Sequence, residues 1–137
     1  MSVPSAMMVA LSVRGEEEIM ADATNRARAR EPEELARLFL ERASAGDVEG
    51  VVALYEPGAV LAGPTGEPVR GTAALRDHYA ALLADPPRFA GTVSPAVREG
   101  DLALTSTRFE GGATAEIARR QPDGTWLWIA DRPNVMA

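Results

Sequence analysis

The fold is decided by residues 43–83, which read ASAGDVEGVVALYEPGAVLAGPTGEPVRGTAALRDHYAALL. Gly46 is typical of the left-handed residue that ends a helix, and Asp47 is a good cap for the next one. One face of this second helix carries Val48, Val51, Val52 and Tyr55, and Pro57 with Gly58 ends the helix. Gly71 opens a third helix. The end of one helix, the whole of a second, the start of a third and two short extended pieces, at 59–62 and near 69, are therefore predicted within this stretch.

The first helix lies upstream of Gly46 and begins at Pro32. Proline suits the first helical position, and Glu33 and Glu34 in the first turn suit the positive end of the helix dipole. Its apolar residues recur at helical spacing and form one buried stripe: Leu35, Leu38, Phe39 and Ala43.

The pattern changes after Phe89, where apolar residues begin to alternate with a period of two. Pro95 indicates an edge position or a bulge, and Pro122 with Gly124 indicates a hairpin. The predicted strands are 89–97, 102–109, 113–120 and 126–131. Three helices followed by an antiparallel meander predict an α+β domain, in which the helices pack on one face of a curved antiparallel sheet.

Composition narrows the possible chemistry. The 137 residues suffice for one domain, and 46% hydrophobic residues with a mean hydropathy of -0.10 are typical of a soluble chain. The absence of Cys and the single His exclude disulfides, thiolate nucleophiles and cysteine–histidine zinc sites. All 14 basic residues are Arg, which excludes lysine Schiff bases. We expect no metal and no cofactor, and the net charge of -6 argues against nucleic-acid and membrane partners.

Residues 1–30 differ from the rest and predict a loosely ordered N-terminal arm before a domain at 31–137. The apolar run 6–11 is too short to span a bilayer and follows no basic segment, so we expect a cytoplasmic protein. Two alternatives remain open for the arm. It forms an amphipathic helix that packs on a partner subunit, or translation naturally starts at Met20.

Residues 43–83 resemble the nuclear transport factor 2-like superfamily, particularly its ketosteroid isomerase-like and SnoaL-like branches. The closing segment RRQPDGTWLWIADRPN resembles the last hairpin of the same group, so the resemblance covers Pro32 to Asn134. It implies a cone-shaped α+β roll with an apolar cavity between helices and sheet. It also implies a homodimer built through the outer face of the sheet.

The resemblance places the isomerase groups residue by residue. The general base of the isomerases falls on Gly63 and their oxyanion-binding tyrosine on Phe39, and neither residue has the required group. Steroid isomerisation by that mechanism is therefore not expected. Tyr55 and Tyr79 match cavity positions of related isomerases, where either phenol orients a ligand; alternatively both pack in the core.

Two residues are candidates for acid–base chemistry. His78 has the one side chain with an ordinary pKa near neutrality, although it also fits a boundary position beside the apolar stripe of its helix. Glu116 is the acidic residue nearest to the late-strand Asp that the isomerases keep protonated. It becomes a neutral donor if it faces inward, or a solvated carboxylate paired with Arg108 or Arg119 if it faces water.

On the last strand, simple alternation puts Trp126, Trp128 and Ala130 on one face and Asp131 on the other. We expect the tryptophan face at a subunit interface, with a ligand-stacking wall as the alternative. Arg108, Glu110 and Asp131 complete the candidates. The predicted ligand-binding residues are Phe39, Tyr55, Gly63, Tyr79, Arg108 and Trp128.

Three functions fit these residues. The first, which we favour, is a cone that binds a small hydrophobic molecule without the isomerase base. The second is an isomerase, cyclase or hydrolase that acts on a polyketide- or terpenoid-like substrate through His78 and Glu116. The third is a dimeric accessory module with a filled cavity.

Overall fold

Helix α2 (Pro32–Ser44) begins with a turn in which a glutamate side chain accepts hydrogen bonds from the backbone N–H groups just before the helix. In the structure, a computed structural model that describes residues 26–136, the Glu34 carboxylate accepts hydrogen bonds from the N–H groups of Arg30 and Glu31. Gly46 then takes a positive φ of 71° after the helix. The boundaries of the first helix are confirmed.

The second helix is shorter than predicted. Asp47 caps it as expected, accepting from Gly50 N–H at 2.9 Å, but α3 (Val48–Val52) stops before Tyr55. Tyr55 instead begins strand β1 (Tyr55–Ala62), where it pairs with Trp128. The prediction that Tyr55 lies on a face of the second helix was wrong. Pairing with β9, a strand distant in the sequence, extends β1 back to Tyr55. Strand β2 (Pro68–Arg70) and helix α4 (Thr72–Leu82) follow as predicted.

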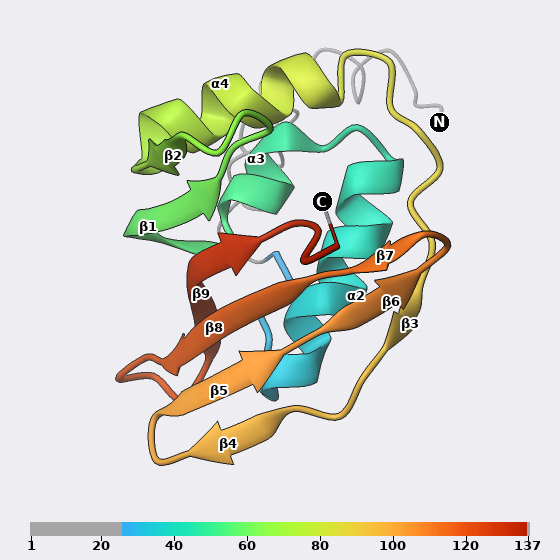
Figure 1. The fold of residues 1–137 in the computed structure, drawn as a ribbon. Helices are drawn as coiled ribbons and strands as arrows, with labels where there is room; N and C mark the ends of the chain where they lie inside the picture. The colour runs from blue at the N-terminus through green and yellow to red at the C-terminus, as the bar shows by residue number, and fades with distance from the viewer. Residues whose placement is uncertain (1–25, 137) are drawn as a thin grey trace, which may run out of the picture.

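The described chain forms a six-stranded sheet in the order β2-β1-β9-β8-β5-β4 and a three-stranded sheet in the order β3-β6-β7 (Figure 1). The remaining strands are β3 (Thr92–Val93), β4 (Val97–Glu99), β5 (Leu102–Thr105), β6 (Thr107–Phe109), β7 (Gly112–Ala113), β8 (Ala115–Arg120) and β9 (Trp126–Arg132). Strands β1 and β9 run parallel, so the larger sheet is mixed and not wholly antiparallel as predicted.

Three predicted strands are each divided in two. The predicted strand 102–109 breaks at Ser106 and the predicted strand 113–120 at Thr114. There, Ser106 Oγ donates to Thr114 O at 2.7 Å, and Thr107 N–H donates to Thr114 Oγ1 at 2.9 Å. These side-chain hydrogen bonds interrupt the regular ladder. Pro95 separates β3 from β4, which lie in different sheets. The hairpin therefore bends, and its ends form the small sheet.

Helices α2, α3 and α4 cover the inner face of the larger sheet (Figure 1). The core between them is built mostly of Ala, Leu and Val, with aromatic rings from α4, β1 and β9. Trp126 and Trp128 belong to this core, with exposures of 3% and 2%. The expectation that the tryptophan face forms a subunit interface is therefore wrong, because both side chains are buried within their own chain.

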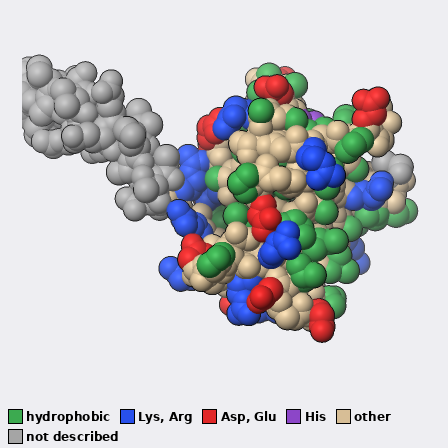
Figure 2. Space-filling view, turned by 90° about the vertical axis from the view of Figure 1, so that its left-hand side faces the viewer, with side chains coloured by type: hydrophobic (Ala, Val, Ile, Leu, Met, Phe, Trp, Pro, Cys, Tyr) green, Lys and Arg blue, Asp and Glu red, His purple; other side chains and the backbone are tan. Residues whose placement is uncertain are grey.

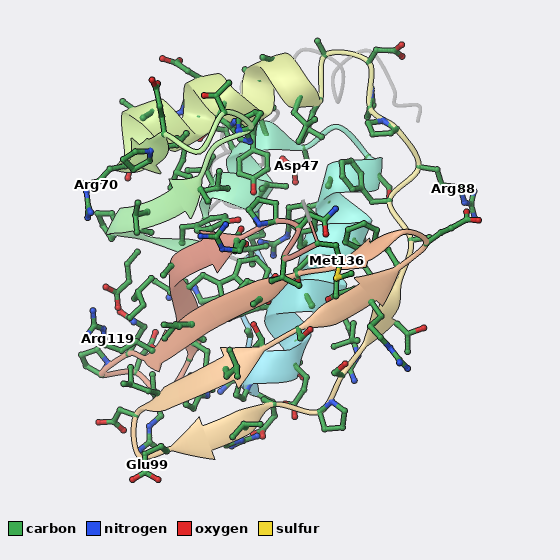
Figure 3. The ribbon with its side chains drawn as sticks, in the orientation of Figure 1. Asp47, Arg70, Arg88, Glu99, Arg119 and Met136 are labelled. Carbon is green, nitrogen blue, oxygen red and sulfur yellow. The ribbon has the colours of Figure 1, made fainter. Side chains whose placement is uncertain are left out.

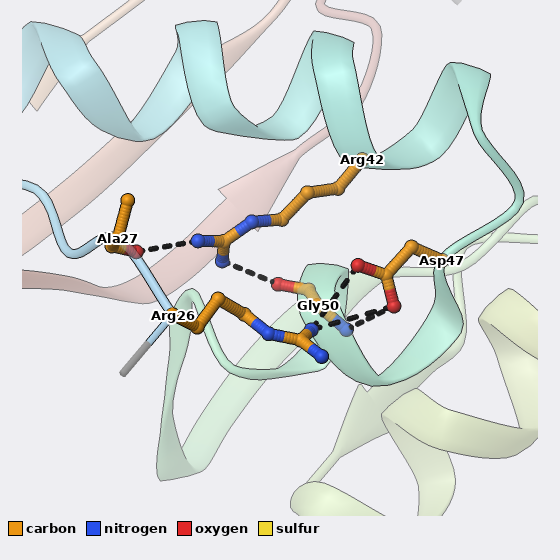
Figure 4. A network of polar contacts seen from close by, with 5 residues as sticks. All are labelled: Arg26, Ala27, Arg42, Asp47 and Gly50. Carbon is orange, nitrogen blue, oxygen red and sulfur yellow. Dashed lines mark hydrogen bonds and ion pairs between the residues drawn. The ribbon is translucent and has the colours of Figure 1, made fainter. Parts of the chain in front are cut away.

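Residues 26–30 pack against the domain through a buried arginine. Arg42 Nη1 donates to Gly50 O at 2.8 Å and Arg42 Nη2 donates to Ala27 O, while Arg26 pairs with Asp47 at 3.1 Å (Figure 4). Gly50 has no room for a side chain, because a Cβ there would lie 2.1 Å from the Asp47 carboxylate. Arg42 thus joins the segment before α2 to the α2–α3 junction.

The rest of the predicted arm, residues 1–25, lies outside the described residues, and so does the proposed start at Met20. Between residues 26 and 136, no helix is long and apolar enough to cross a membrane.

Candidate functional site

A cavity of about 350 Å³ lies between α2, α4, the loop after α4 and the inner faces of both sheets. Its walls are mainly apolar and aromatic, with few polar groups. The lining residues are Ala36, Phe39, Leu40, His78, Tyr79, Leu82, Pro87, Arg88, Phe89, Ala90, Thr107, Phe109, Thr114, Glu116, Trp128, Asp131 and Pro133. Such a volume and lining are typical of a site for a small molecule.

The loop after α4 forms the mouth of the cavity. Pro87, Phe89 and Ala90 contribute to the lining from this loop. Arg88 lies on the same loop and is exposed, and Figure 3 shows its side chain extending away from the body of the domain. The other polar lining residues are His78 on α4, Thr107 on β6, Thr114 between β7 and β8, Glu116 on β8 and Asp131 on β9; Tyr79 on α4 adds a phenol.

A β-bulge in β9 places Trp128 and Asp131 on the same wall. Ile117 pairs with Ala130, whereas the next residue, Ala118, pairs with Trp128, so Ile129 is the extra residue. One inserted residue reverses the alternation of faces beyond it. Both side chains consequently line the cavity, although three positions separate them.

Asp131 lies at the end of a chain of phenols. Tyr55 Oη donates to Asp131 Oδ2 at 2.5 Å, and the hydroxyl groups of Tyr55 and Tyr79 are 2.7 Å apart. The other carboxyl oxygen, Asp131 Oδ1, is buried and has no hydrogen-bond partner among residues 26–136. A buried polar atom without a partner is costly, so this oxygen suits a ligand or a water molecule.

The environment of Asp131 favours the protonated acid. Burial is the main cause that raises its pKa from 3.8 to about 7, and the charge of Glu116 raises it further, against the hydrogen bond from Tyr55. Burial also raises the pKa values of Tyr55 and Tyr79 well above their ordinary range. Near neutral pH the phenols are neutral, and Asp131 changes its protonation state.

Glu116 lies directly opposite Asp131 on the neighbouring strand β8. Thr105 Oγ1 donates to Glu116 Oε1 at 2.6 Å, and Trp128 Nε1–H donates to Thr105 Oγ1 at 3.0 Å. Burial raises the pKa of Glu116, while hydrogen bonds from Thr105 and Thr114 lower it. Its carboxyl group is therefore held in a fixed position beside Asp131.

His78 lines the cavity from α4 with its ring 4.9 Å from the ring of Tyr79. Burial lowers its pKa, so the imidazole is neutral at pH 7. Among the described residues, no hydrogen bond joins His78 to Glu116. No cluster of three or more His, Cys, Asp or Glu side chains suited to a metal occurs between residues 26 and 136.

The family is shown by the sequence comparison. The family model of the SnoaL-like domain matches residues 36–132, which include every strand and most of α2. The chain belongs to the SnoaL-like domain family. The predicted resemblance to SnoaL-like proteins is thereby confirmed. No curated protein sequence matches the chain.

Solved structures confirm the fold of this SnoaL-like domain. A ketosteroid isomerase-like protein from Erwinia carotovora atroseptica is 20% identical, covers 73% of this chain and 89% of its own, and gives a TM-score of 0.63. A nuclear transport factor 2-like protein with a cystatin-like fold from Novosphingobium aromaticivorans is 21% identical, with coverages of 88% and 85% and a TM-score of 0.58. A cystatin-like fold protein from Nostoc punctiforme is 25% identical, with coverages of 72% and 84% and a TM-score of 0.55.

Several predicted site residues of the SnoaL-like domain meet at one cavity. They are Phe39, His78, Tyr79, Glu116 and Trp128. Tyr55 lies behind the wall and contacts the cavity through Tyr79 and Asp131. Glu116 faces inward, and Arg119 pairs with Glu56 at 2.9 Å, so the surface pairing of Glu116 is wrong.

Three predicted ligand-binding residues do not line this cavity: Tyr55 lies behind its wall, and Gly63 and Arg108 lie away from it. Gly63 lies in the β1–β2 turn, where its N–H donates to Glu67 O at 2.8 Å and a Cβ would lie 2.7 Å from the same oxygen. Arg108 is exposed on β6. Both residues were predicted from sequence alone. The β1–β2 turn holds Gly63 away from the cavity, and Arg108 points outward from β6.

Asp131 was a candidate but was not among the predicted ligand-binding residues. Simple alternation placed it on the face opposite Trp128, whereas both side chains line the cavity. The bulge that reverses its direction has no sequence signal of the usual kind, since the extra residue is Ile129 and not a glycine.

Proposed function

We propose that this SnoaL-like domain binds a small, mainly apolar molecule in the cavity between α2, α4 and the sheets. The observation that carries the proposal is a preformed apolar cavity of about 350 Å³ whose inner wall presents the unpartnered oxygen of Asp131. Phe39, Tyr79 and Trp128 leave this volume open, which argues against an accessory module with a filled cavity. Aromatic walls provide the affinity, and the few polar groups orient the ligand.

Ala90→Trp tests this proposal, because Ala90 is exposed at the mouth and lines the cavity. An indole there blocks entry without disturbing the core. The protein is incubated with a mixture of hydrophobic metabolites, and retained masses are measured by native mass spectrometry. We expect the wild type to retain a ligand and Ala90→Trp to lose at least about 90% of it, a tenfold loss of affinity.

Ala84→Trp is the matched control, since Ala84 is exposed on the same loop but does not line the cavity. It should retain ligand like the wild type. Equal retention by Ala90→Trp and the wild type would contradict the proposed site, and a wild type that retains nothing would contradict ligand binding.

A second candidate function is acid–base catalysis on such a ligand. The observation that favours it is the pair of carboxyl groups on one wall, Glu116 and Asp131, which are paired across adjacent strands and whose pKa values are both raised by burial. With a ketone in the cavity, Glu116 removes a proton from the carbon beside the carbonyl. The electrons of the broken C–H bond form an enolate, whose oxygen accepts a hydrogen bond from protonated Asp131. Return of a proton from Glu116 completes an isomerisation.

Exchange of a ketone's protons for deuterium measures this step directly. In D2O at saturating tetralone, we expect the wild type to catalyse exchange at the carbon beside the carbonyl, as followed by NMR. Glu116→Gln should slow the exchange by about a hundredfold or more, because the amide is not a base. Glu110→Gln, which alters an exposed acid, serves as the control. Exchange no faster than in buffer would exclude this function for the pair.

We further propose that two copies associate through the outer face of the larger sheet. Large apolar side chains on β4, β5 and β8 are exposed there: Val97 (66%), Leu104 (48%), Leu102 (42%) and Ile117 (41%). Figure 2 shows hydrophobic side chains gathered low on the right, the side toward which this face is turned. A continuous apolar patch on adjacent strands is typical of a self-complementary interface.

Leu104→Glu tests this association. Two-fold symmetry would bring both introduced carboxylates into one interface, so we expect the mass measured by sedimentation velocity to fall from dimer to monomer. Val135→Glu changes an apolar side chain of similar exposure, 43%, that lies outside the sheet, and should leave the mass unchanged. A monomeric wild type, or a Leu104→Glu variant that stays dimeric, would contradict the interface.

A further inference from the structure

The inner wall of the cavity carries two acidic side chains side by side. Glu116 on β8 and Asp131 on β9 are directly paired across the strands, and both line the cavity. Glu116 is 5% exposed, and the Oδ1 atom of Asp131 is buried. Like charges directly opposite on neighbouring strands are unfavourable, so a positive group beside this pair would be stabilising.

Both carboxyl groups accept hydrogen bonds from inside the protein. Tyr55 donates to Asp131 Oδ2, and Thr105 donates to Glu116 Oε1. A carboxylate has about four acceptor positions, so each group keeps further positions after accepting one bond. Asp131 Oδ1 has no hydrogen-bond partner among residues 26–136. This part of the wall therefore presents acceptors to a ligand.

The described part of the chain does not neutralise this pair with a cation. None of the ion pairs between residues 26 and 136 includes Glu116 or Asp131. Two basic residues line the cavity, but His78 is neutral at pH 7 because burial lowers its pKa. The other, Arg88, is exposed and extends away from the domain (Figure 3). A ligand can supply the positive charge that these residues do not.

Aromatic rings line the cavity around Phe39. Its ring lies 5.6 Å from that of Phe89, 6.0 Å from that of Tyr79 and 6.1 Å from that of Trp128, and all four residues belong to the lining. Such rings bury the apolar body of a ligand, and their faces also attract a cation. A cavity of about 350 Å³ is near the lower end of the range for small-molecule sites, so a body of one or two rings suits it.

We propose that the cavity binds a small cyclic amine as its ammonium cation, with the nitrogen between the carboxylates of Glu116 and Asp131 and the ring system against the aromatic wall. Side chains directly paired on adjacent strands are roughly 5 Å apart, so one nitrogen can reach both carboxyl groups. An ammonium group has three donors, and its hydrogen bonds to carboxylates are stronger than those of a neutral donor. This inference rests on the proposed function, because it names the class of ligand for the same cavity.

Three probes with one ring system test the charge that the cavity selects: an aminotetralin, the alcohol with a hydroxyl in place of the amino group, and the corresponding carboxylate. Calorimetric titration at pH 8 measures each affinity, because there the amine is still protonated and the pH lies above the pKa of about 7 of Asp131. We expect the wild type to bind the amine at least about tenfold more tightly than the alcohol. The carboxylate should bind more weakly than the alcohol, since it is repelled by the two acids.

Two variants of nearly unchanged shape assign the contacts. Glu116→Gln and Asp131→Asn each remove one negative charge, so each should lower the affinity for the aminotetralin by about tenfold. The affinity for the alcohol should change much less, which also shows that the cavity of each variant is intact. Glu99→Gln is the matched control, because it removes the same charge from an exposed residue of β4 that does not line the cavity (Figure 3). It should bind all three probes like the wild type.

Equal affinity of the wild type for the amine and the alcohol would overturn the inference. Failure of the amine to bind, or variants that keep the wild-type preference for it, would overturn it as well. The proposed function is decided separately, by the retention of hydrophobic metabolites in the wild type and Ala90→Trp. A wild type that retains neutral metabolites or binds the alcohol but not the amine would therefore contradict this inference alone.

Discussion

The stability of the wild type, compared with that of Asp131→Asn, should fall by about 4 kcal/mol as the pH rises from about 4 to about 8. The pKa of Asp131 is raised from 3.8 to about 7 in the folded protein. The folded state therefore holds its proton over a range in which the unfolded state has lost it. The contribution is fully present below 3.8 and is lost as the pH approaches 7.

Other groups act on the same profile, and the comparison with Asp131→Asn removes most of their effects. The lowered pKa values of Glu33, Glu56 and Asp123 make stability rise with pH in the acid range, and the lowered pKa of His78 makes it rise toward neutrality. These groups are common to both proteins. The raised pKa of Glu116 acts in the same direction as Asp131, and only the part due to the Asp131 charge remains in the difference.

Urea unfolding of both proteins at a series of pH values measures this difference. The amide introduced by Asp131→Asn still accepts from Tyr55 and has no proton to lose. The stability curves should therefore converge in acid and separate toward pH 8, with Asp131→Asn the more stable. Parallel curves would show that Asp131 is not held neutral in the folded state.

The second large effect is expected for Trp128→Ala, which should lower the free energy of unfolding by about 3–5 kcal/mol. Trp128 is 2% exposed. Its ring lies 5.3 Å from that of Tyr55 and 6.1 Å from that of Phe39, and its N–H donates to Thr105. Truncation removes these contacts and leaves a void that joins the existing cavity.

Leu127→Ala is the control, because Leu127 is on the same strand, half-buried and on the other face. It should cost about 1 kcal/mol. Trp128→Phe should fall between the two, since it restores most of the ring packing but not the N–H bond to Thr105. Urea unfolding decides the order, and a Trp128→Ala variant no less stable than Leu127→Ala would contradict the place of Trp128 in the core.

Much of the fold could be predicted because its signals are local. Pro32 with two acidic residues marks the start of α2, and Gly46 with Asp47 marks the change to α3, as the structure confirms. Each signal depends on backbone geometry within a few residues. Where a distant partner decides, prediction failed: Tyr55 was assigned to a helix, but pairing with β9 makes it the first residue of β1.

In the candidate site, too, local signals were enough to predict some residues, whereas others depend on contacts with distant parts of the chain. Helical spacing and the family resemblance were enough to bring Phe39, His78 and Tyr79 to the cavity. Strand positions were less certain, because one bulge reverses every side chain beyond it. The bulge at Ile129 turns Asp131 inward beside Glu116, and alternation alone had placed it on the opposite face.

The sequence by itself was enough to predict the order of the three helices between residues 26 and 136 and the SnoaL-like family, because both depend on residue types at short-range spacing. The tertiary structure alone decided which side chains share the cavity wall and what they can do there. Asp131 and Glu116 come to lie side by side on this wall only through cross-strand pairing, and their buried hydrogen bonds come from Tyr55 and Thr105, so the arrangement depends on residues far apart in the sequence.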